Sequence, residues 1–180
     1  GWVRAGRQEV GMGQSSAMGG GALLGAGTAG PQPPPQLGAR VVYEELAHLG
    51  LPHTPVTSAQ LVAPGTWAPP PSLPFTEPVP GPAFFASLPT FCRVTATLKP
   101  SSDSDIRVEV WLPVDGWNRK LQGVGNGGWS GGISYRALGD GVRAGYAAAS
   151  TDTGHQGSGA DASFALGHPE KVADFAYRAV

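Results

Sequence analysis

The sequence predicts a mixed α/β fold, in which an antiparallel hairpin precedes strands that alternate with helices. Apolar and polar residues alternate over residues 93–98 and 106–112, which indicates two strands joined by a polar turn. Residues 121–180 then read as strand, glycine loop, helix, strand and helix. Strands that alternate with helices favour a mostly parallel sheet with helices on its faces.

The composition divides the chain into a tail, residues 1–40, and a folded part, residues 41–180. The 180 residues include 28 glycines and 18 prolines, and the tail has both a run of three glycines and a proline-rich stretch. Such a segment cannot bury enough apolar surface to offset its ordering entropy, so we predict that it is disordered. A signal peptide is the alternative for this tail, although glycines dilute the apolar stretch that it would need.

Charge, apolar runs and cysteine usage exclude several classes of protein. The 12 basic and 13 acidic residues give a formal net charge of −1, which excludes a strongly basic nucleic-acid binder. No run of about 18 apolar residues is present, so no transmembrane helix is predicted. The single cysteine excludes an internal disulfide framework and a zinc site built from several cysteines.

The first elements of the folded part are a short helix and a proline-rich covering segment. Residues 44–49 form a helix candidate that Gly50 ends. Residues 64–89 hold many prolines, but aromatic residues are interleaved with them, namely Trp67, Phe75, Phe84 and Phe85. We therefore expect an extended segment docked on a core, with a polyproline ligand for SH3-type modules as the alternative.

Two short strands and a helix follow the hairpin. A strand is predicted over residues 121–125, and a helix over residues 133–142, closed by Gly145. Residues 146–150 are mostly small, as expected of a strand buried inside a sheet. We also expect an unpaired sheet edge beside this strand, which would make the chain poorly soluble on its own.

The last elements are a polar loop over residues 151–161 and a helix. Pro169 opens this helix, because proline suits the first helical position. An apolar stripe is expected along the helix at Val172, Phe175, Ala176 and Ala179.

The glycine-rich stretch after residue 122 fits two kinds of chemistry. Gly123, Gly125 and Gly128 match the fingerprint of a dinucleotide-binding oxidoreductase. Asp152 follows a strand at the place expected of a ribose-binding acid. The context fits poorly, because the preceding strand starts from a polar run and Trp129 stands where a pyrophosphate must approach closely.

The same glycines also suit acyl transfer through a tetrahedral intermediate, which needs backbone N–H donors aimed at a developing oxyanion. The α/β-hydrolases take one such donor from a loop after the third strand, and their sheet begins with the element order predicted here. Gly128, with Gly127 as second choice, lies at that place. Glycine suits the role because no Cβ blocks the approach of the carbonyl. A tight turn without any ligand is the structural alternative.

Several long motifs resemble the tannase/feruloyl esterase family, over roughly residues 43–180. The motifs are Trp-Asn at 117–118, Gly-Val-Gly-Asn-Gly-Gly-Trp at 123–129, Gly-Ile-Ser-Tyr at 132–135, Gly-Tyr-Ala at 145–147, Ala-Ser-Thr-Asp-Thr-Gly-His at 149–155 and Asp-Ala-Ser-Phe-Ala-Leu-Gly-His-Pro-Glu-Lys at 161–171, with shorter matches at 57–60 and 88–93. The resemblance implies a secreted serine esterase with an α/β-hydrolase core, which cleaves esters of phenolic acids such as gallate or ferulate through an acyl-enzyme. It also implies a small-molecule partner and a lid domain that carries calcium, whereas no metal or cofactor site is expected in this chain.

The chain departs from the family's pattern in its catalytic residues. The family's Cys-Ser-x-Gly-Gly nucleophile turn and the Asp and His of its triad come after the residues matched here, and the 180 residues contain no Cys-Ser pair and no Gly-x-Ser-x-Gly. We therefore expect this N-terminal part of the domain to be inactive alone, with a non-catalytic interaction fragment as a further alternative. The family has a cysteine near the position of Tyr43 that pairs with the one matching Cys92, so Cys92 is expected to be unpaired.

Two histidines, His155 and His168, stand near acidic residues, as also occurs in catalytic triads and metal sites. The candidate partners are Asp152, Asp161 and Asp174. Because the resemblance places the family's catalytic pair downstream, we expect neither role. Asp152 and His155, with Thr153 between them, are expected to organise a loop through side-chain-to-backbone hydrogen bonds. His168 is expected to cap the last helix.

Overall fold

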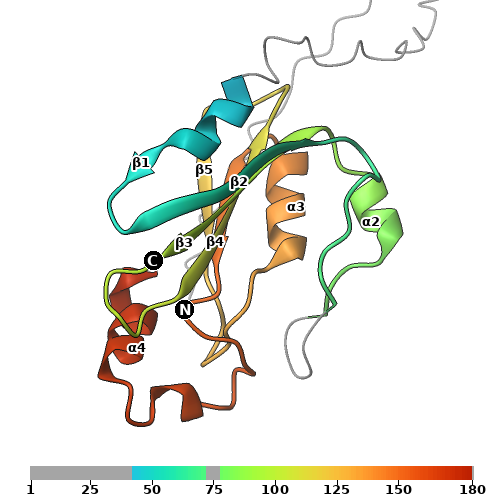
Figure 1. The fold of residues 1–180 in the computed structure, drawn as a ribbon. Coiled ribbons are helices and arrows are strands. Elements are labelled where there is room, and N and C mark those ends of the chain that lie inside the picture. Colours follow the sequence, from blue (N-terminus) through green and yellow to red (C-terminus); the bar gives the residue numbers. More distant parts are fainter. Residues whose placement is uncertain (1–41, 72–77, 180) are drawn as a thin grey trace, which may run out of the picture. The chain divides into compact units, whose positions relative to one another are not determined.

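The computed structural model describes residues 42–71 and 78–179, and these form a six-stranded mixed sheet (Figure 1). The strands are β1 (Gly50–Leu51), β2 (Thr54–Val62), β3 (Phe91–Leu98), β4 (Ile106–Pro113), β5 (Leu121–Val124) and β6 (Ala147–Thr151). Their order across the sheet is β1-β2-β3-β4-β6-β5. The predicted disordered tail, 1–40, and Phe75 lie outside the described residues.

The helical elements are short. They include α2 (Pro82–Ala86), α3 (Tyr135–Arg143) and α4 (Pro169–Ala173), the 3₁₀ turns η1 (Glu45–His48) and η2 (Ser163–Ala165), and the π-helical turn η3 (Asp174–Arg178). The predicted helices at residues 44–49 and 133–142 are thus present with slightly different bounds. In the described part of the chain, no helix has the length and apolar character needed to cross a membrane.

The predicted hairpin is present as β3 and β4. The two strands pair antiparallel over their whole lengths, from Phe91 opposite Pro113 to Leu98 opposite Ile106. On one face the rings of Phe91 and Trp111 stack, with their centroids 4.3 Å apart. The alternation that predicted these strands therefore reflects burial of one side of the sheet.

β6 lies inside the sheet and β5 forms its edge. β6 pairs antiparallel with β4 and parallel with β5, and the described residues offer β5 no other partner strand. The expectation of an unpaired edge beside residues 146–150 is therefore wrong. The edge lies one strand further out, where Leu121 is 68% exposed. The small side chains of Ala147 and Ala148 let β6 occupy the buried position between its two neighbours.

β2 is a strand that the sequence pattern did not reveal. It pairs antiparallel with β3 over most of its length, with an irregularity between Val56 and Ser58. Pro52 and Pro55 hide the pattern, because proline normally argues against a strand interior. Pro55 is tolerated because it lies opposite Gly50 of the two-residue strand β1, at the outer edge of the sheet.

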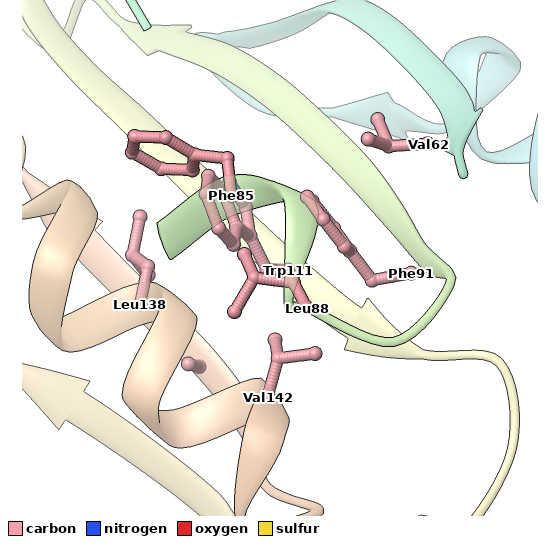
Figure 2. Close-up of a cluster of buried hydrophobic side chains, with 8 residues drawn as sticks. Val62, Phe85, Leu88, Phe91, Trp111, Leu138 and Val142 are labelled. Atoms are coloured by element: carbon pink, nitrogen blue, oxygen red, sulfur yellow. The ribbon is translucent and has the colours of Figure 1, made fainter. Parts of the chain in front are cut away.

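The main hydrophobic core lies between the sheet and the helices α2 and α3 (Figure 1, Figure 2). Trp111 of β4 is fully buried in this core, where Leu138 and Val142 of α3 face it. Trp67 packs edge-on against Phe85 and Trp111, with ring centroids 5.5 and 5.3 Å away. This contact confirms that the proline-rich segment docks on a core, but the expectation that the segment is extended is wrong at residues 82–86, which form the helix α2.

α4 begins at Pro169 as predicted, but the expected apolar stripe is only partly buried. Val172 and Ala176 are exposed, whereas Asp174 is fully buried. The reason is the π-helical turn η3, which the hydrogen bond from Ala179 N–H to Asp174 O closes at 3.0 Å. The wider π-turn changes which residues face the core. Apolar residues spaced as in a regular α-helix therefore no longer coincide with the buried positions.

Candidate active site

The glycine loop (residues 125–132) follows β5 and contains a tight turn. Ser130 N–H donates to Gly127 O at 3.1 Å and closes the turn. Gly128, at its first central position, has φ +58°, and the next residue stays out of the left-handed region. This is the pattern of a type II′ turn, which requires a positive φ at that position. The glycine at Gly128 is therefore explained by the turn itself.

The second loop (residues 152–161) follows β6 and holds the glycine loop in place. Trp129 N–H donates to Gly159 O at 3.0 Å. Gly131 and Gly157 exchange both backbone hydrogen bonds, at 3.1 and 3.2 Å. The backbones approach so closely that a Cβ at Gly131 would overlap the second loop. The two loops therefore form one hydrogen-bonded unit.

The N–H groups of Gly127 and Gly128 donate to no acceptor in the described part of the chain. Gly127 lines a cavity of about 880 Å³, and a Cβ at this position would meet no atom within 4 Å. Gly128 does not line this cavity. Of the two donors predicted from the sequence, the second choice, Gly127, is thus the one that borders a space large enough for a ligand.

The cavity extends from the glycine loop across the sheet toward the start of α3. Its lining combines side chains of the sheet, of the second loop and of the segment entering α3, among them Arg93, Glu109, Asp152, Gln156, Ile133 and Tyr135. Asn126 also lines it, and its side-chain amide donates to the Thr151 carbonyl at 3.0 Å. This bond ties the start of the glycine loop to the end of β6.

A buried ion pair borders the cavity on the sheet side. Arg93 Nε donates to Glu109 Oε2 at 2.7 Å, and the second oxygen of the carboxylate pairs with the Nη2 nitrogen of the same guanidinium. Glu109 also accepts the indole N–H of Trp111 at 2.9 Å and the hydroxyl of Tyr135 at 3.3 Å. Burial, together with the nearby carboxylate, raises the pKa of Tyr135, so its hydroxyl remains a donor. The Trp67 ring covers the guanidinium at 4.9 Å.

The sequence analysis missed this network, although one signal was available. Arg93 and Glu109 both fall on positions that the alternation of their strands places on the same face as buried aromatic residues. A charged residue at such a position needs a partner of opposite charge. Their exact pairing depends on the register of the hairpin, which the sequence alone does not specify.

Asp152 is a buried carboxylate with a structural role. It is 3% exposed, and its Oδ1 accepts the backbone N–H groups of Arg107 at 2.9 Å and Gly154 at 3.0 Å. Burial raises the pKa of Asp152 against the effect of these hydrogen bonds. Moreover, α3 begins only at Tyr135, so Gly128 does not open a helix as the dinucleotide fingerprint requires. The dinucleotide alternative therefore lacks its helix terminus, and Oδ1 of Asp152 is already bound by the backbone.

The other residues considered for a triad or a metal site do not come together. His168 Nδ1 faces Asp103 at 3.0 Å on the surface, and Asp161 accepts a backbone N–H at the start of η2. Asp174 is buried elsewhere, beside Arg178 at 3.0 Å. Within residues 42–71 and 78–179, no group of three or more His, Cys, Asp or Glu side chains is arranged to hold a metal ion.

His155 has the loop-organising role expected of it. Its Nε2 lies 2.7 Å from the Trp129 carbonyl oxygen, and its Nδ1 lies 3.3 Å from the Thr153 hydroxyl. Its ring stacks on that of Phe164, with the centroids 3.5 Å apart. The side-chain-to-backbone contact reaches across to the glycine loop, which sequence spacing did not indicate.

Cys92 is a free and fully buried thiol, and burial raises its pKa to about 11. A thiol in this state is a poor nucleophile. Burial, with smaller contributions from Cys92 and Asp115, also raises the pKa of Tyr43.

Comparison with known proteins shows which chemistry the chain is related to. A model of the family described as tannase and feruloyl esterase matches residues 92–180. An uncharacterized esterase of Xanthomonas campestris pv. campestris is 43% identical over 142 residues, which are 79% of this chain and 23% of that protein. A probable feruloyl esterase B-2 of Aspergillus flavus is 39% identical over 89 residues, 49% of this chain and 16% of that protein. Residues 92–180 belong to the tannase and feruloyl esterase family.

A solved structure of the tannase and feruloyl esterase family shares this fold. Feruloyl esterase B from Aspergillus oryzae matches it with a TM-score of 0.62 and 27% sequence identity, over 78% of this chain and 26% of that chain. The comparisons confirm the resemblance that the sequence motifs predicted. The chain covers between 16% and 26% of the length of these relatives, so it corresponds to a partial region of the family's fold.

Proposed function

We propose that this chain forms the N-terminal part of the α/β-hydrolase domain of a secreted serine-type carboxylic ester hydrolase that acts on esters of phenolic acids. Family membership supports an ester substrate, and relatives described as feruloyl esterases support a phenolic acid. The element order from β3 to α4 supports the hydrolase fold, because a hairpin, a strand, a glycine loop, a helix and a further strand succeed one another. Secretion is proposed from the family resemblance alone.

The single observation that carries the chemistry is the pair of N–H groups at Gly127 and Gly128, which have no acceptor among the residues that the structure describes. Acyl transfer develops a negative charge on the ester carbonyl oxygen, and fixed backbone donors stabilise it without reorganising. We assign the first donor to Gly127, because this residue lines the cavity, and the second to Gly128. The cavity offers room for the acyl group of a phenolic ester beside the Gly127 donor.

The serine nucleophile and its aspartate and histidine are assigned to no residue of this chain. Among its serines, Ser134 and Ser150 are buried, and no serine lies in a Gly-x-Ser-x-Gly or Cys-Ser motif. The 180-residue chain, assayed alone, should therefore hydrolyse neither methyl gallate nor methyl ferulate above a buffer control. Turnover that a serine-directed inhibitor abolishes would contradict this.

Substitution of Gly127 tests the donor directly, because proline removes the backbone N–H and alanine keeps it. A suitable host is a chimera in which the 142 residues shared with the Xanthomonas esterase replace that protein's own. Gly127→Ala should leave kcat on methyl ferulate within about twofold, as expected of a substitution into open space. Gly127→Pro should lower kcat about 10²- to 10³-fold, the effect of a lost oxyanion donor.

Stability measurements separate the loss of a donor from damage to the fold. Because Gly127 N–H has no acceptor in the described part of the chain, its removal breaks no internal hydrogen bond. Both variants should therefore melt near the parent chimera. A folded Gly127→Pro variant with the parent's kcat would show that the Gly127 N–H is not an oxyanion donor. A folded parent chimera that hydrolyses neither ester would refute the function proposed for this segment.

A further inference from the structure

The second loop starts with a strained turn that places His155. The N–H of His155 donates to Asp152 O at 3.3 Å and closes the turn. Both central residues of the turn, Thr153 and Gly154, have positive φ, +57° and +83°. This is the pattern of a type I′ turn, which favours glycine, asparagine or aspartate. A β-branched threonine in the left-handed region is a genuine outlier and persists only where the surroundings hold it. The turn thus keeps an unfavourable backbone conformation, and this conformation places the His155 imidazole.

The imidazole of His155 is held at Nε2 and on one face. Its Nε2 lies 2.7 Å from the Trp129 carbonyl oxygen, and since a carbonyl only accepts, Nε2 carries the proton. Nδ1 lies 3.3 Å from the Thr153 hydroxyl, which donates its single proton to the Asp152 carbonyl at 2.7 Å. The ring of Phe164 stacks against it with the planes inclined by 9°. The side chain is therefore fixed in one tautomer and one orientation.

Trp129 connects this imidazole to the free donors of the turn. Its N–H is bound by Gly159 O, and its carbonyl is bound by His155, so the second loop fixes both of its backbone polar groups. Peptide planes rotate only about φ and ψ, so fixing the two planes of Trp129 restrains the adjoining planes. The adjoining plane on the N-terminal side carries the N–H of Gly128, and Ser130 N–H also holds this plane through the Gly127 carbonyl; the N–H of Gly127 lies one plane further away.

We propose that His155 is a positioning residue for the oxyanion donors, an inference that rests on the function proposed above. Its Nε2–H holds the Trp129 carbonyl, and the turn in consequence keeps the N–H groups of Gly127 and Gly128 in place. His155 touches neither the substrate nor the reacting atoms; it acts through the turn. Misplacement of a catalytic group by about 1 Å can lower the rate about 10²-fold, so this restraint has a measurable effect on kcat.

Two substitutions separate the hydrogen bond of His155 from its packing. His155→Gln keeps an N–H donor for the Trp129 carbonyl, whereas His155→Phe keeps a ring for Phe164 and has no donor. In the Xanthomonas chimera, the Phe variant should lower kcat on methyl ferulate about 10- to 100-fold with little change of KM, and the Gln variant should recover most of it. His168→Phe is the matched control, because His168 lies exposed beside Asp103, and it should leave both constants unchanged.

Amide exchange in the 180-residue chain tests the same restraint without any activity. The N–H groups of Trp129 and Ser130 should exchange at least about tenfold faster in His155→Phe than in the parent chain. In His155→Gln they should exchange at nearly the parent rate. If the Phe variant does not fold, His155→Met replaces it, because methionine also lacks a donor but adapts to irregular space.

The outcomes distinguish this inference from the proposed function. A folded variant without the donor that keeps both the parent's kcat and its amide exchange rates overturns the role of His155. A Gln variant as impaired as the Phe variant does the same. A folded but inactive parent chimera counts against the proposed function instead, and the exchange rates then decide the role of His155 by themselves.

Discussion

The backbone of Gly128 touches that of Gly159 so closely that a Cβ on Gly128 would lie 2.6 Å from the Gly159 carbonyl oxygen. Gly128 also has a positive φ, whereas its neighbour Gly127 does not and has open space around the position of a Cβ. Two adjacent glycines therefore serve different purposes. The fold requires a glycine at Gly128, whereas Gly127 is free to face a ligand.

Gly128→Ala should lower the free energy of unfolding by about 1–3 kcal/mol, because alanine is strained at φ +58° and its Cβ meets the second loop. Gly127→Ala is the matched control and should change that free energy by less than about 0.5 kcal/mol. Urea denaturation of both variants measures the difference. Equal midpoints would show that the loop relaxes freely around Gly128.

Arg93→Met should lower the free energy of unfolding by about 3–5 kcal/mol, because it leaves the Glu109 carboxylate buried without its cation. Lys99→Met is the control, since Lys99 and Asp105 form a pair whose side chains are 60% and 52% exposed. Its effect should stay below about 1 kcal/mol. A loss at Arg93 no larger than that at Lys99 would show that water reaches Glu109 readily.

Asp152→Asn should flatten the dependence of stability on pH. Burial raises the pKa of Asp152, so the folded chain holds this proton more tightly than the unfolded chain does. Its contribution to stability is therefore full below the unfolded pKa, near about 3.9, and is lost as the pH rises through the folded pKa. Asparagine keeps an Oδ1 acceptor for Arg107 and Gly154 N–H and cannot ionise. Relative to the parent, the variant should gain stability from about pH 4 upward.

The control for this pH effect is Asp161→Asn, for which the sign is opposite. The backbone N–H of Ser163 lowers the pKa of Asp161, so this carboxylate contributes stability above the unfolded pKa and loses it as the pH falls. Urea denaturation between about pH 4 and pH 7 compares the two variants with the parent. Parallel pH profiles for both variants would contradict the assignment.

Leu121→Lys should reduce self-association of the 180-residue chain. Leu121 lies exposed on β5, the edge strand, and edge strands with apolar residues template pairing between chains. Leu166→Lys is the control, because Leu166 is also exposed but lies outside the sheet. Light scattering against concentration compares the three chains. An equal decrease in both variants would attribute the effect to net charge rather than to the edge.

The elements that the sequence predicted well are those whose signals are local. Alternation in the hairpin, Pro169 at the start of α4 and Gly145 after α3 each depend on a few neighbouring residues, and all three are present. The docked proline-rich segment was also predictable, because aromatic side chains among prolines need a core to cover. Trp67 meets that expectation.

The features that escaped prediction depend on contacts between distant segments. The order that puts β6 between β4 and β5 follows from the path of the chain through α3, and the register that joins Arg93 to Glu109 follows from the hairpin as a whole. The burial of Asp174 depends on a π-helical turn, which the spacing of apolar residues in the sequence does not predict. At the site, the glycine loop was predictable from composition, but the contact of His155 with Trp129 joins two loops that only the fold brings together.

β5 is completed during synthesis before its partner exists. β5 ends at Val124, whereas β6, with which it pairs, begins only at Ala147. A ribosome adds about 5–20 residues per second from the N-terminus. The β3–β4 hairpin can therefore form before β6 and the second loop, which pair with β5 and the glycine loop, have been synthesised. A nascent chain halted before Gly159 has no acceptor for Trp129 N–H and cannot hold the turn. The turn on which the proposed chemistry depends therefore takes shape later than the β3–β4 hairpin, only after β6 and Gly159 have been synthesised.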